Sequence, residues 1–330
     1  VAGGIRSLRF KDGALWRFDS AGRLISQADR NGNTVTLIRD GQGRVIGITE
    51  PSGRQLTISY TGTNLRIDSI RDPFGREVRY GYDGSGRLTI VTDAAGGITR
   101  YSYDSAHRMV TITDPRNITF LTNEYDAAGR VIRQTQADGG VWNFAYTASG
   151  SFISQTTVTD PRGSGTTYRF NAAGYLVSQT NALGQTTTFD REPGTNLIRT
   201  TTDPIGRVAR FTYDASGNVT SITDPASNVR RFEYEPVFNK LTKITDPLWQ
   251  ITTFEYDVKG NLIATVDPTG ARTTIAYNVF GQPVSTTDPL GNTTPFTYDD
   301  FGNLATIADP LGNETQRAYD FVSRLIEQTD

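Results

Sequence analysis

The sequence predicts an all-β protein, an antiparallel ribbon of tandem β-hairpins. The first observation is a period of 21 or 22 residues, with one step of 24, that continues from residue 29 to the end of the chain. The second is a pair of aromatic rings two residues apart in most periods, which is strand spacing. The third is a pair of turn signatures that recur along the chain, Asp-Pro-x-Gly and Asp-x-x-Gly. Such a period indicates one unit stacked many times rather than separate globular cores.

The first residue of the Asp-Pro-x-Gly turn, or its substitute, marks each period. These markers are Asp29, Glu50, Asp72, Asp93, Asp114, Gln136, Asp160, Asn181, Asp203, Asp224, Asp246, Asp267, Asp288, Asp309 and Asp330. We therefore expect lead-in strands over residues 1–28 and a single domain of 14 tandem repeats over residues 29–330. The chain begins without Met and stops on the first residue of a new period. Both ends are expected to be cuts in a longer protein.

The first strand of each hairpin carries its two rings eight and ten residues after the marker. The aromatic ladder predicted from these pairs comprises Tyr80, Tyr82, Tyr101, Tyr103, Phe211, Tyr213, Phe232, Tyr234, Phe254, Tyr256, Phe296 and Tyr298. Side chains two apart in a strand share one face of the sheet. We therefore expect the rings to be buried and to stack from hairpin to hairpin, where aromatic neighbours stabilise a sheet.

Two turns close each period, and their residue types explain why the chain turns there. The turn residues of the clearest repeats are Asp72, Pro73, Gly75, Asp203, Pro204, Gly206, Asp214, Gly217, Asp257 and Gly260. An aspartate side chain accepts hydrogen bonds from the backbone two residues on, proline presets φ, and glycine supplies a positive φ. Each period is therefore expected to be one hairpin joined to the next by a short turn.

The return strand leaves one ambiguity open. Val219 and Ile222 are three residues apart, as are Leu304 and Ile307, whereas Leu262 and Val266 are four apart, so the spacing is not consistently the two residues of a strand. Either a β-bulge inserts an extra residue, or apolar side chains face both sides of the sheet.

Composition excludes several classes of function. The 33 Lys and Arg and 35 Asp and Glu residues are mixed along the chain, for a net charge of −2, whereas a nucleic-acid surface needs clustered positive charge. The absence of cysteine excludes disulfides and thiolate metal sites. No apolar run approaches the roughly 18 residues of a membrane-spanning helix, and no signal peptide is visible.

The residues that could carry chemistry have simpler structural explanations. His107, the single histidine, stands where other repeats have glycine, so we expect a turn residue. Paired carboxylates can perform glycoside hydrolysis, but these aspartates recur at every turn, as turn chemistry alone predicts. The segment Asp29-Arg30-Asn31-Gly32-Asn33 has a superficial calcium-loop pattern without the distal bidentate Glu. We therefore expect no enzyme activity, no catalytic or metal-binding residue and no cofactor.

The repeated motif resembles a known family. Tyr213-Asp214-Ala215-Ser216-Gly217-Asn218 and Tyr256-Asp257-Val258-Lys259-Gly260-Asn261 are similar to the tyrosine–aspartate (YD) repeats of bacterial Rhs proteins, of Tc-toxin shell subunits and of teneurins. The resemblance covers residues 15–330 and implies a ribbon that spirals into part of a hollow shell. In that family the shell commonly encloses a C-terminal toxin, which is released by self-cleavage after a core motif. That motif is absent here, so no autoproteolytic residue carries over.

The resemblance implies a structural role for this chain. We expect a segment of a secreted or cell-surface bacterial shell, whose partners are the remaining repeats and the C-terminal toxin of the same polypeptide. The alternative is a surface adhesin or carbohydrate-binding array that contacts a glycan or a receptor, and a glycoside hydrolase is a remote third. We also expect that this chain alone cannot enclose a folded cargo. Its terminal strand edges would be templates for edge-to-edge self-association.

Overall fold

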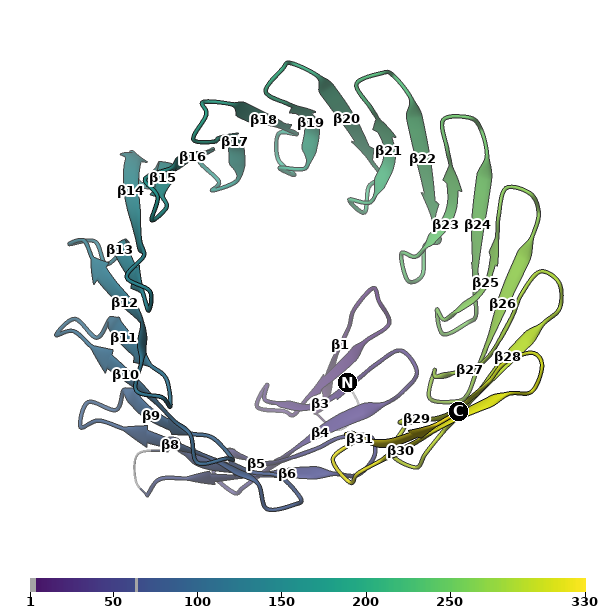
Figure 1. Ribbon diagram of the computed structural model, residues 1–330, viewed down its shortest axis with the longest axis horizontal. Helices are drawn as coiled ribbons and strands as arrows, with labels where there is room; N and C mark the ends of the chain where they lie inside the picture. The colour runs from purple at the N-terminus through teal and green to yellow at the C-terminus, as the bar shows by residue number, and fades with distance from the viewer. Residues whose placement is uncertain (1–3, 63–64) are drawn as a thin grey trace. The chain divides into compact units, whose positions relative to one another are not determined.

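The computed structural model describes residues 4–62 and 65–330, and every regular element in them is a β-strand. The 31 strands are antiparallel, which confirms the all-β hairpin ribbon expected from the sequence. The chain divides into two compact units, and Figure 1 labels most of their strands. Unit 1 comprises Val1–Thr57 and Val229–Asp330, and unit 2 comprises Ile58–Asn228. Within the described ranges, no helix is long and apolar enough to cross a membrane.

Unit 1 contains the first strands of the chain and the last ones. They are β1 (Arg6–Arg9), β2 (Leu15–Phe18), β3 (Leu24–Ala28), β4 (Thr34–Arg39), β5 (Val45–Thr49), β22 (Val229–Tyr234), β23 (Leu241–Thr245), β24 (Ile251–Tyr256), β25 (Leu262–Val266), β26 (Arg272–Tyr277), β27 (Pro283–Thr287), β28 (Thr293–Tyr298), β29 (Leu304–Ala308), β30 (Glu314–Tyr319) and β31 (Leu325–Thr329). Strand β6 (Gln55–Tyr60) runs across the boundary between the units.

Unit 2 is an uninterrupted succession of hairpins. Its strands are β7 (Ile67–Arg71), β8 (Glu77–Tyr82), β9 (Leu88–Thr92), β10 (Ile98–Tyr103), β11 (Met109–Thr113), β12 (Thr119–Tyr125), β13 (Val131–Gln136), β14 (Val141–Ser149), β15 (Phe152–Thr159), β16 (Gly165–Phe170), β17 (Leu176–Thr180), β18 (Thr186–Arg191), β19 (Ile198–Thr202), β20 (Val208–Tyr213) and β21 (Val219–Thr223).

A β-bulge in each ring-bearing hairpin resolves the ambiguity of the return strand. Where β20 pairs with β21, Phe211 lies opposite Ile222, but the register then shifts so that Tyr213 lies opposite Val219. Thr220 is the extra residue, and the bulge brings Val219 and Ile222 to the face that carries the rings. The same shift occurs at the second ring of the hairpins β8–β9, β10–β11, β24–β25 and β28–β29.

Both explanations of the spacing hold in the hairpin β24–β25. Leu262 lies opposite Tyr256 and Thr265 opposite Phe254, so these two share the ring face. Val266 lies opposite Thr253 and faces the other side of the sheet. Apolar residues three apart therefore share a face across the bulge, and those four apart do not.

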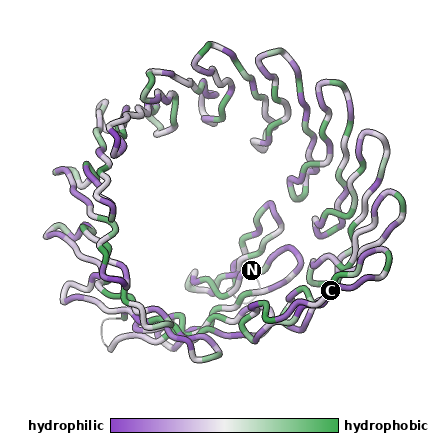
Figure 2. Tube along the Cα trace, viewed as in Figure 1, coloured by the Kyte–Doolittle hydropathy of each residue, from purple (hydrophilic) through white to green (hydrophobic). Residues whose placement is uncertain are grey.

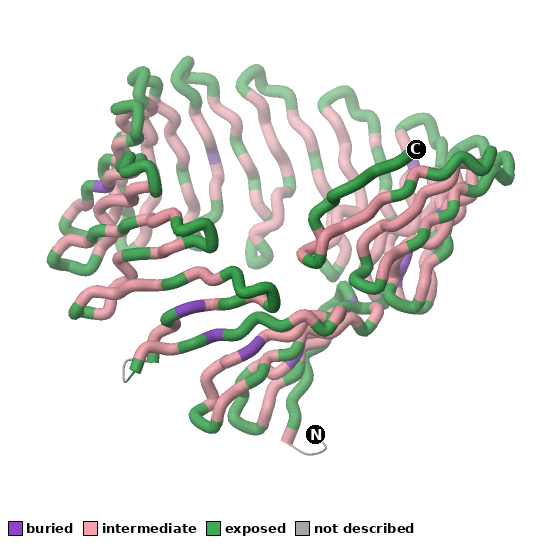
Figure 3. Tube along the Cα trace, turned by 60° about the horizontal axis from the view of Figure 1, so that its bottom comes forward, coloured by how far each residue is buried: buried purple, intermediate pink, exposed green. Residues whose placement is uncertain are grey.

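The sheet is a single layer with little fully buried surface. Figure 3 shows strands that are mostly half-buried and turns that are mostly exposed. Among the described residues, only Ile58 and Ala264 are buried hydrophobic side chains. Figure 2 shows that hydrophobic and hydrophilic segments alternate along the hairpins, as a strand-and-turn repeat requires. The stability of each hairpin therefore depends mainly on contacts with its immediate neighbours.

Candidate functional site, a seam between two hairpin edges

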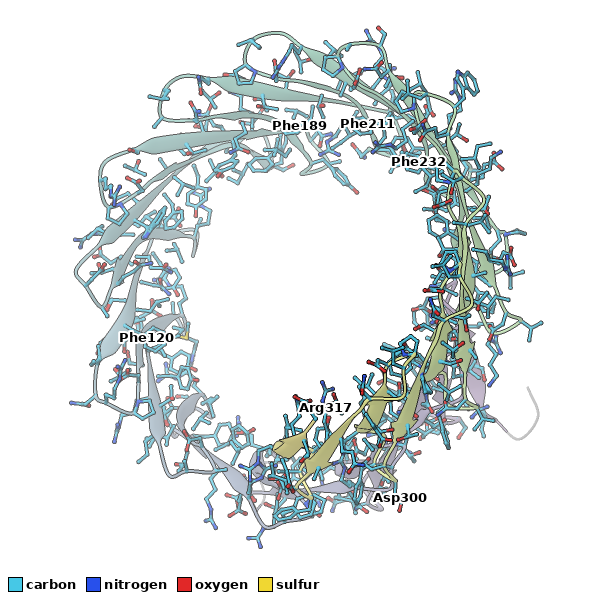
Figure 4. The ribbon with its side chains drawn as sticks, turned by 45° about the vertical axis from the view of Figure 1, so that its right-hand side comes forward. Phe120, Phe189, Phe211, Phe232, Asp300 and Arg317 are labelled. Carbon is cyan, nitrogen blue, oxygen red and sulfur yellow. The ribbon has the colours of Figure 1, made fainter. Side chains whose placement is uncertain are left out.

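The rings of the predicted aromatic ladder lie on one face of the sheet and are half-buried. In Figure 4, Phe189 and Phe211 of neighbouring hairpins lie on the same side of the ribbon in unit 2. We expected these rings to be buried, but a single-layer sheet has no second layer to cover them. Their stacking from hairpin to hairpin stays a prediction.

The tyrosine at the second ring position makes a specific hydrogen bond that the sequence alone does not predict. The hydroxyl of Tyr213 donates to the carbonyl of Ile198 at 2.7 Å, and that of Tyr256 donates to Leu241 at 2.8 Å. In each case the acceptor is the first residue of the preceding return strand, at the bulge of the preceding hairpin. A bulge disrupts the ladder there, and the tyrosine supplies a donor for its carbonyl.

This bond recurs along the chain and reaches back 15 residues, or 16 at Tyr125. It is made by Tyr82, Tyr103, Tyr125, Tyr146, Tyr213, Tyr256, Tyr277, Tyr298 and Tyr319. Where arginine stands in place of the tyrosine, its guanidinium reaches the equivalent carbonyl, as Arg191 does at Leu176 and Arg39 at Leu24. This position therefore needs a long side chain that ends in a hydrogen-bond donor. The replacement of tyrosine by arginine at this position in some repeats is the sequence signal that could have revealed this requirement.

The two kinds of turn are built in the same way. In the Asp-Pro turn, Asp203 Oδ1 accepts the backbone N–H of Ile205 at 3.0 Å and that of Arg207 at 2.9 Å. In the Tyr-Asp turn, Asp214 Oδ1 accepts the N–H of Ser216 at 2.8 Å and that of Asn218 at 2.9 Å. The second carboxylate oxygen, Oδ2, accepts the side chain four residues on in both turns. The aspartates are thus occupied in shaping the turns.

The glycine of each turn has a positive φ, which closes the loop. Its φ is 85° at Gly75, Gly206 and Gly217 and 83° at Gly260. His107 occupies the same position with φ 63°, and its backbone N–H donates to the Asp104 carbonyl at 3.1 Å. The histidine is therefore a turn residue, as its place in the repeat indicated.

These hydrogen bonds also set the electrostatics of the turn carboxylates. At Asp126, the backbone N–H of Arg130, followed by its guanidinium, holds the pKa of the carboxyl below its usual range. At Asp309, the side-chain amide and backbone N–H of Asn313 lower the pKa of that carboxyl in the same way. Carboxylates stabilised as anions by fixed donors are poorly suited to general acid–base chemistry near neutral pH.

Alternating turns place the two turn types on opposite edges of the ribbon. In unit 1, the Asp-Pro edge holds residues 10–14, 29–33 and 50–54 of the first hairpins, and residues 246–250, 267–271, 288–292 and 309–313 of the last ones. The Tyr-Asp edge of the last hairpins holds residues 235–240, 257–261, 278–282, 299–303 and 320–324. The Asp-Pro edge of the first hairpins contacts this Tyr-Asp edge, and we call that contact the seam.

Asn261 lies at the centre of the seam and is 1% exposed. Its Nδ2 donates to Asn31 Oδ1 at 3.0 Å and to Asp257 Oδ2 at 2.9 Å. Its Oδ1 accepts Arg30 Nε at 3.1 Å and Asn31 Nδ2 at 3.3 Å. The two asparagine amides therefore bond reciprocally across 230 positions of sequence. A buried side-chain amide whose nitrogen and oxygen are both hydrogen-bonded fixes how the two edges are aligned with each other.

Side chains on one edge of the seam fit against glycines on the other. A Cβ atom on Gly13 would lie 3.0 Å from Cε1 of Phe238, and a Cβ on Gly281 would lie 2.1 Å from Nδ2 of Asn31. Further along, Arg54 lies over the ring of Phe301, 5.4 Å from its centroid, and donates to Ser323 Oγ at 2.9 Å. At Gly13 and Gly281, the fit of the seam thus depends on a glycine facing the side chains of Phe238 and Asn31.

The residue four after the aspartate of a Tyr-Asp turn varies between arginine and asparagine from repeat to repeat. It is arginine at Arg23, Arg44, Arg87, Arg108, Arg130 and Arg324, and asparagine at Asn218, Asn261 and Asn303. In unit 2, Arg108 donates to Asp104 Oδ2 at 2.7 Å and to the carbonyl of Asp126 at 2.9 Å, and lies 4.8 Å from the ring centroid of Tyr125. The long side chain links its turn to the next hairpin.

Asparagine at this position is too short to make that link. Asn261 bonds to its own Asp257 and keeps its remaining atoms for Asn31 across the seam. The replacement of arginine by asparagine is visible in the sequence. The contact with Asn31 that it permits cannot be predicted from the sequence, because Asn31 lies 230 residues from Asn261.

A cleft of 570 Å³ opens at one end of the seam. Its walls include the exposed rings of Phe280 and Phe301 and the side chains of Glu50, Arg54 and Asp299. The guanidinium of Arg54 donates to Glu50 and holds the pKa of that carboxyl below its usual range.

Several polar groups of this cleft are already bonded within the protein. Gln282 Nε2 donates to the Gly302 carbonyl at 2.9 Å, and Asn303 Nδ2 donates to Asp299 Oδ2 at 2.8 Å. In the described part of the chain no three His, Cys, Asp or Glu residues group to hold a metal. Asp29, at the start of the calcium-like segment, instead accepts the backbone N–H groups of Asn31 and Asn33 at 2.8 and 2.9 Å.

Comparison with protein families agrees with this repeat geometry. The teneurin YD-shell model matches residues 160–329, which is just over half of the 330-residue chain. The chain belongs to the teneurin YD-shell family. The RHS repeat model matches residues 18–55, 66–98 and 91–119 in the earlier part of the same YD-shell chain. The chain is thus a shell-type structural segment, as the resemblance implied. No curated protein matches the sequence.

Solved structures similar to this YD-shell chain include assemblies of Tc toxins. The crystal structure of TcdB2-TccC3-TEV shares 15% identity at a TM-score of 0.37, covering 96% of this chain and 25% of that one. The structure of TcdB2-TccC3-Cdc42 shares 15% identity at a TM-score of 0.36, covering 98% and 26%. The Photorhabdus luminescens Tc holotoxin pore gives 15% and 0.35, covering 98% and 25%. This chain therefore spans about a quarter of the length of the solved chains it matches.

Proposed function

We propose that this chain is a segment of the wall of a hollow Rhs-type shell, secreted by or exposed on bacteria, that encloses a C-terminal toxin. The observation that carries the proposal is the seam, in which the edges of two sets of YD hairpins close on each other through Asn31 and Asn261. A container wall built from a ribbon needs such lateral contacts, because hydrogen bonds along the ladder join only consecutive strands.

The partners in this proposal are the remaining repeats and the toxin of the same longer polypeptide. Residues 29–330 act as one repeat domain in it, with residues 1–28 as its lead-in strands. The chain itself has no catalytic role in this proposal. Its recurring carboxylates are bonded to turn N–H groups and to the residue four positions on, as at Asp203 and Asp214.

A carbohydrate-binding surface is the second candidate, and the cleft beside Phe280 and Phe301 is the observation that favours it. Exposed rings with nearby amides and carboxylates are the composition of many sugar sites. Against it, Gln282 and Asp299 are already bonded to Gly302 and Asn303. A glycan array separates the two candidates, because a wall segment binds no glycan saturably. A glycoside hydrolase, the remote third, would show turnover on glycoside substrates that a single Asp→Asn change abolishes.

The test of the wall proposal is limited proteolysis of the native polypeptide as its cell produces it. We expect an enclosed portion that resists protease, and we expect Asn261→Arg, which places a long cation in the filled centre of the seam, to make that portion susceptible. Asn303→Arg, at the same turn position outside the asparagine pair, is the matched control. The proposal is wrong if the native polypeptide has no protected portion, or if both variants leave its protection intact.

A further inference from the structure

The two asparagines at the centre of the seam differ in the residue that follows each of them. Asn31 is followed by Gly32, the one Asn-Gly pair in the sequence, whereas Asn261 is followed by the bulky Leu262. An asparagine loses its side-chain nitrogen as ammonia when the next backbone nitrogen attacks the amide carbon. A glycine has no side chain to obstruct that attack. Asn31 is therefore the member of the pair that is open to this modification.

The turn leaves room for the reaction at Gly32. This glycine is exposed, and a Cβ atom built on it would meet no atom within 4 Å. Asn261, by contrast, is only 1% exposed. Crowding therefore does not protect the bond between Asn31 and Gly32, so any protection must come from the hydrogen bonds of the two reacting groups.

Both reacting groups are held in other hydrogen bonds while the seam is closed. The side-chain amide of Asn31 accepts from Asn261 at 3.0 Å and donates to it at 3.3 Å. The attacking N–H of Gly32 donates to the Asp29 carbonyl at 3.2 Å. Ring closure needs the two reacting atoms aligned, and the contact across the seam prevents the Asn31 amide from rotating freely toward Gly32. The closed seam therefore protects Asn31, and opening frees its amide.

We propose that Asn31 is a deamidation site gated by the seam, so that opening the seam exposes it to an irreversible change. The Gly32 nitrogen forms a bond to Asn31 Cγ and gives up its proton, while the C–N bond of the side-chain amide breaks and releases ammonia. Water then opens the resulting succinimide ring and leaves aspartate or isoaspartate. This goes beyond the wall function and rests on the seam alone, whatever the shell encloses.

The product cannot rebuild the same contact, which makes the seam a one-way latch. A carboxylate at position 31 has no N–H for Asn261 Oδ1, which accepts Asn31 Nδ2 at 3.3 Å. The carboxylate would also lie beside Asp257, because Asn261 Nδ2 donates to both Asn31 Oδ1 and Asp257 Oδ2, at 3.0 and 2.9 Å. Two carboxylates that share one donor repel each other. Deamidation therefore weakens the seam and favours its open form.

Mass spectrometry of the peptide that contains Asn31, after incubation of the full chain near neutral pH, tests the gate. Deamidation should be at least about tenfold slower in the folded chain than in urea, because its rate follows the population of the open form. Asn33 lies in the same peptide, is followed by Thr34, and is the internal reference that should change far more slowly in urea. Equal rates at Asn31 in the folded and unfolded chains would overturn the proposal.

Variants of the seam test whether the contact with Asn261 is what protects Asn31. Asn261→Ala should speed deamidation in the folded chain by at least about tenfold, which corresponds to about 1.4 kcal/mol of opening free energy. Asn303→Ala, the matched change outside the asparagine pair, should leave the rate unchanged. Arg54→Ala removes the contact with Phe301 without altering either asparagine, and should also raise the rate. It replaces Asn261→Ala if circular dichroism shows that variant to be unfolded. Seam variants that deamidate no faster than Asn303→Ala would refute the gate.

The variant Asn31→Asp tests the latch, because it carries the deamidated side chain from the start. Hydrogen–deuterium exchange should be faster than in the wild type in the hairpins on both sides of the seam and unchanged in unit 2. Exchange at the seam that matches the wild type would show that the closed form tolerates the carboxylate, and the latch would be wrong.

Discussion

Replacing Asn261 with alanine removes the centre of the seam and is the sharpest perturbation that the structure offers. The side chain takes part in four hydrogen bonds, three of them to Arg30 and Asn31 across the seam and one to Asp257 in its own turn. A hydrogen bond contributes about 0.5–1.5 kcal/mol net, and more is lost when a buried partner stays unpaired. The side chains of Arg30 and Asn31 can regain water once the seam opens. We therefore expect Asn261→Ala to lower the free energy of unfolding of unit 1 by about 2–3 kcal/mol.

Asn303→Ala is the matched control for this change. Asn303 has the same place in its turn, and its amide donates to Asp299 Oδ2 at 2.8 Å, as Asn261 does to Asp257. It lacks the reciprocal asparagine partner, so its loss should cost about 1 kcal/mol, the value of one turn bond. The difference between the two variants then measures the contribution of the seam.

Hydrogen–deuterium exchange coupled to denaturant titration is the assay. In Asn261→Ala, exchange should accelerate in residues 10–57 and 238–282 and stay unchanged in unit 2. A double-mutant cycle with Asn31→Ala should give a coupling energy of about 0.5–3 kcal/mol, as for residues in one hydrogen-bonded network. Equal effects of Asn261→Ala and Asn303→Ala, together with zero coupling to Asn31, would refute the seam as a stabilising contact.

Three further predictions concern the repeat itself. Tyr256→Phe keeps the half-buried ring but removes the hydroxyl that donates to the Leu241 carbonyl. Urea unfolding should therefore show a free energy of unfolding that is lower by about 1 kcal/mol. An unchanged midpoint would mean that water fully replaces the hydroxyl. Arg108→Asn removes the hydrogen bond to the Asp126 carbonyl and the contact with the Tyr125 ring. It should lower the free energy of unfolding by about 1 kcal/mol and speed hydrogen exchange in the β10–β11 and β12–β13 hairpins. Faster exchange throughout the chain would contradict a local link. The pKa of Asp126 is lowered in the folded chain, so its stabilisation is complete above the unfolded pKa of about 3.9 and is lost as pH falls through the folded value. The thermal midpoint should therefore stay level from about pH 7 to 5 and fall below about pH 4, and a level midpoint down to pH 3 would count against the turn carboxylates.

Much of the fold could be predicted from the sequence because the repeat constrains it locally. The spacing of Phe211 and Tyr213 predicted a strand face, and Asp203 and Gly206 predicted the turn, since both inferences need only neighbours within a few residues. The bulge could not be decided, because Val219 and Ile222 fit two explanations until the register was known. Full burial of the rings was expected because a paired ring usually lies between two layers, and this ribbon has one.

The candidate site was out of reach of the sequence for a different reason. Nothing in the repeat containing Asn31 distinguishes it as the partner of Asn261, because the contact depends on how two distant edges meet. The signals that could have pointed to it are exchanges within the repeat. Asparagine replaces arginine four residues after Asp257, and Asn31 stands where later turns such as Asp288-Pro289-Leu290-Gly291 carry leucine. These exchanges are visible only when the repeats are compared position by position.

The seam changes how unit 1 is held together. In a ribbon of hairpins each strand contacts only its neighbours, so opening one hairpin weakens the next and leaves distant ones unaffected. Contacts such as Asn31 with Asn261, and Arg54 with Phe301, join hairpins that are far apart in sequence. Opening any hairpin on either side of the seam then loses neighbour contacts and seam contacts together. A few polar bonds at the edges can therefore make the one-dimensional array of hairpins in unit 1 behave as one cooperative body.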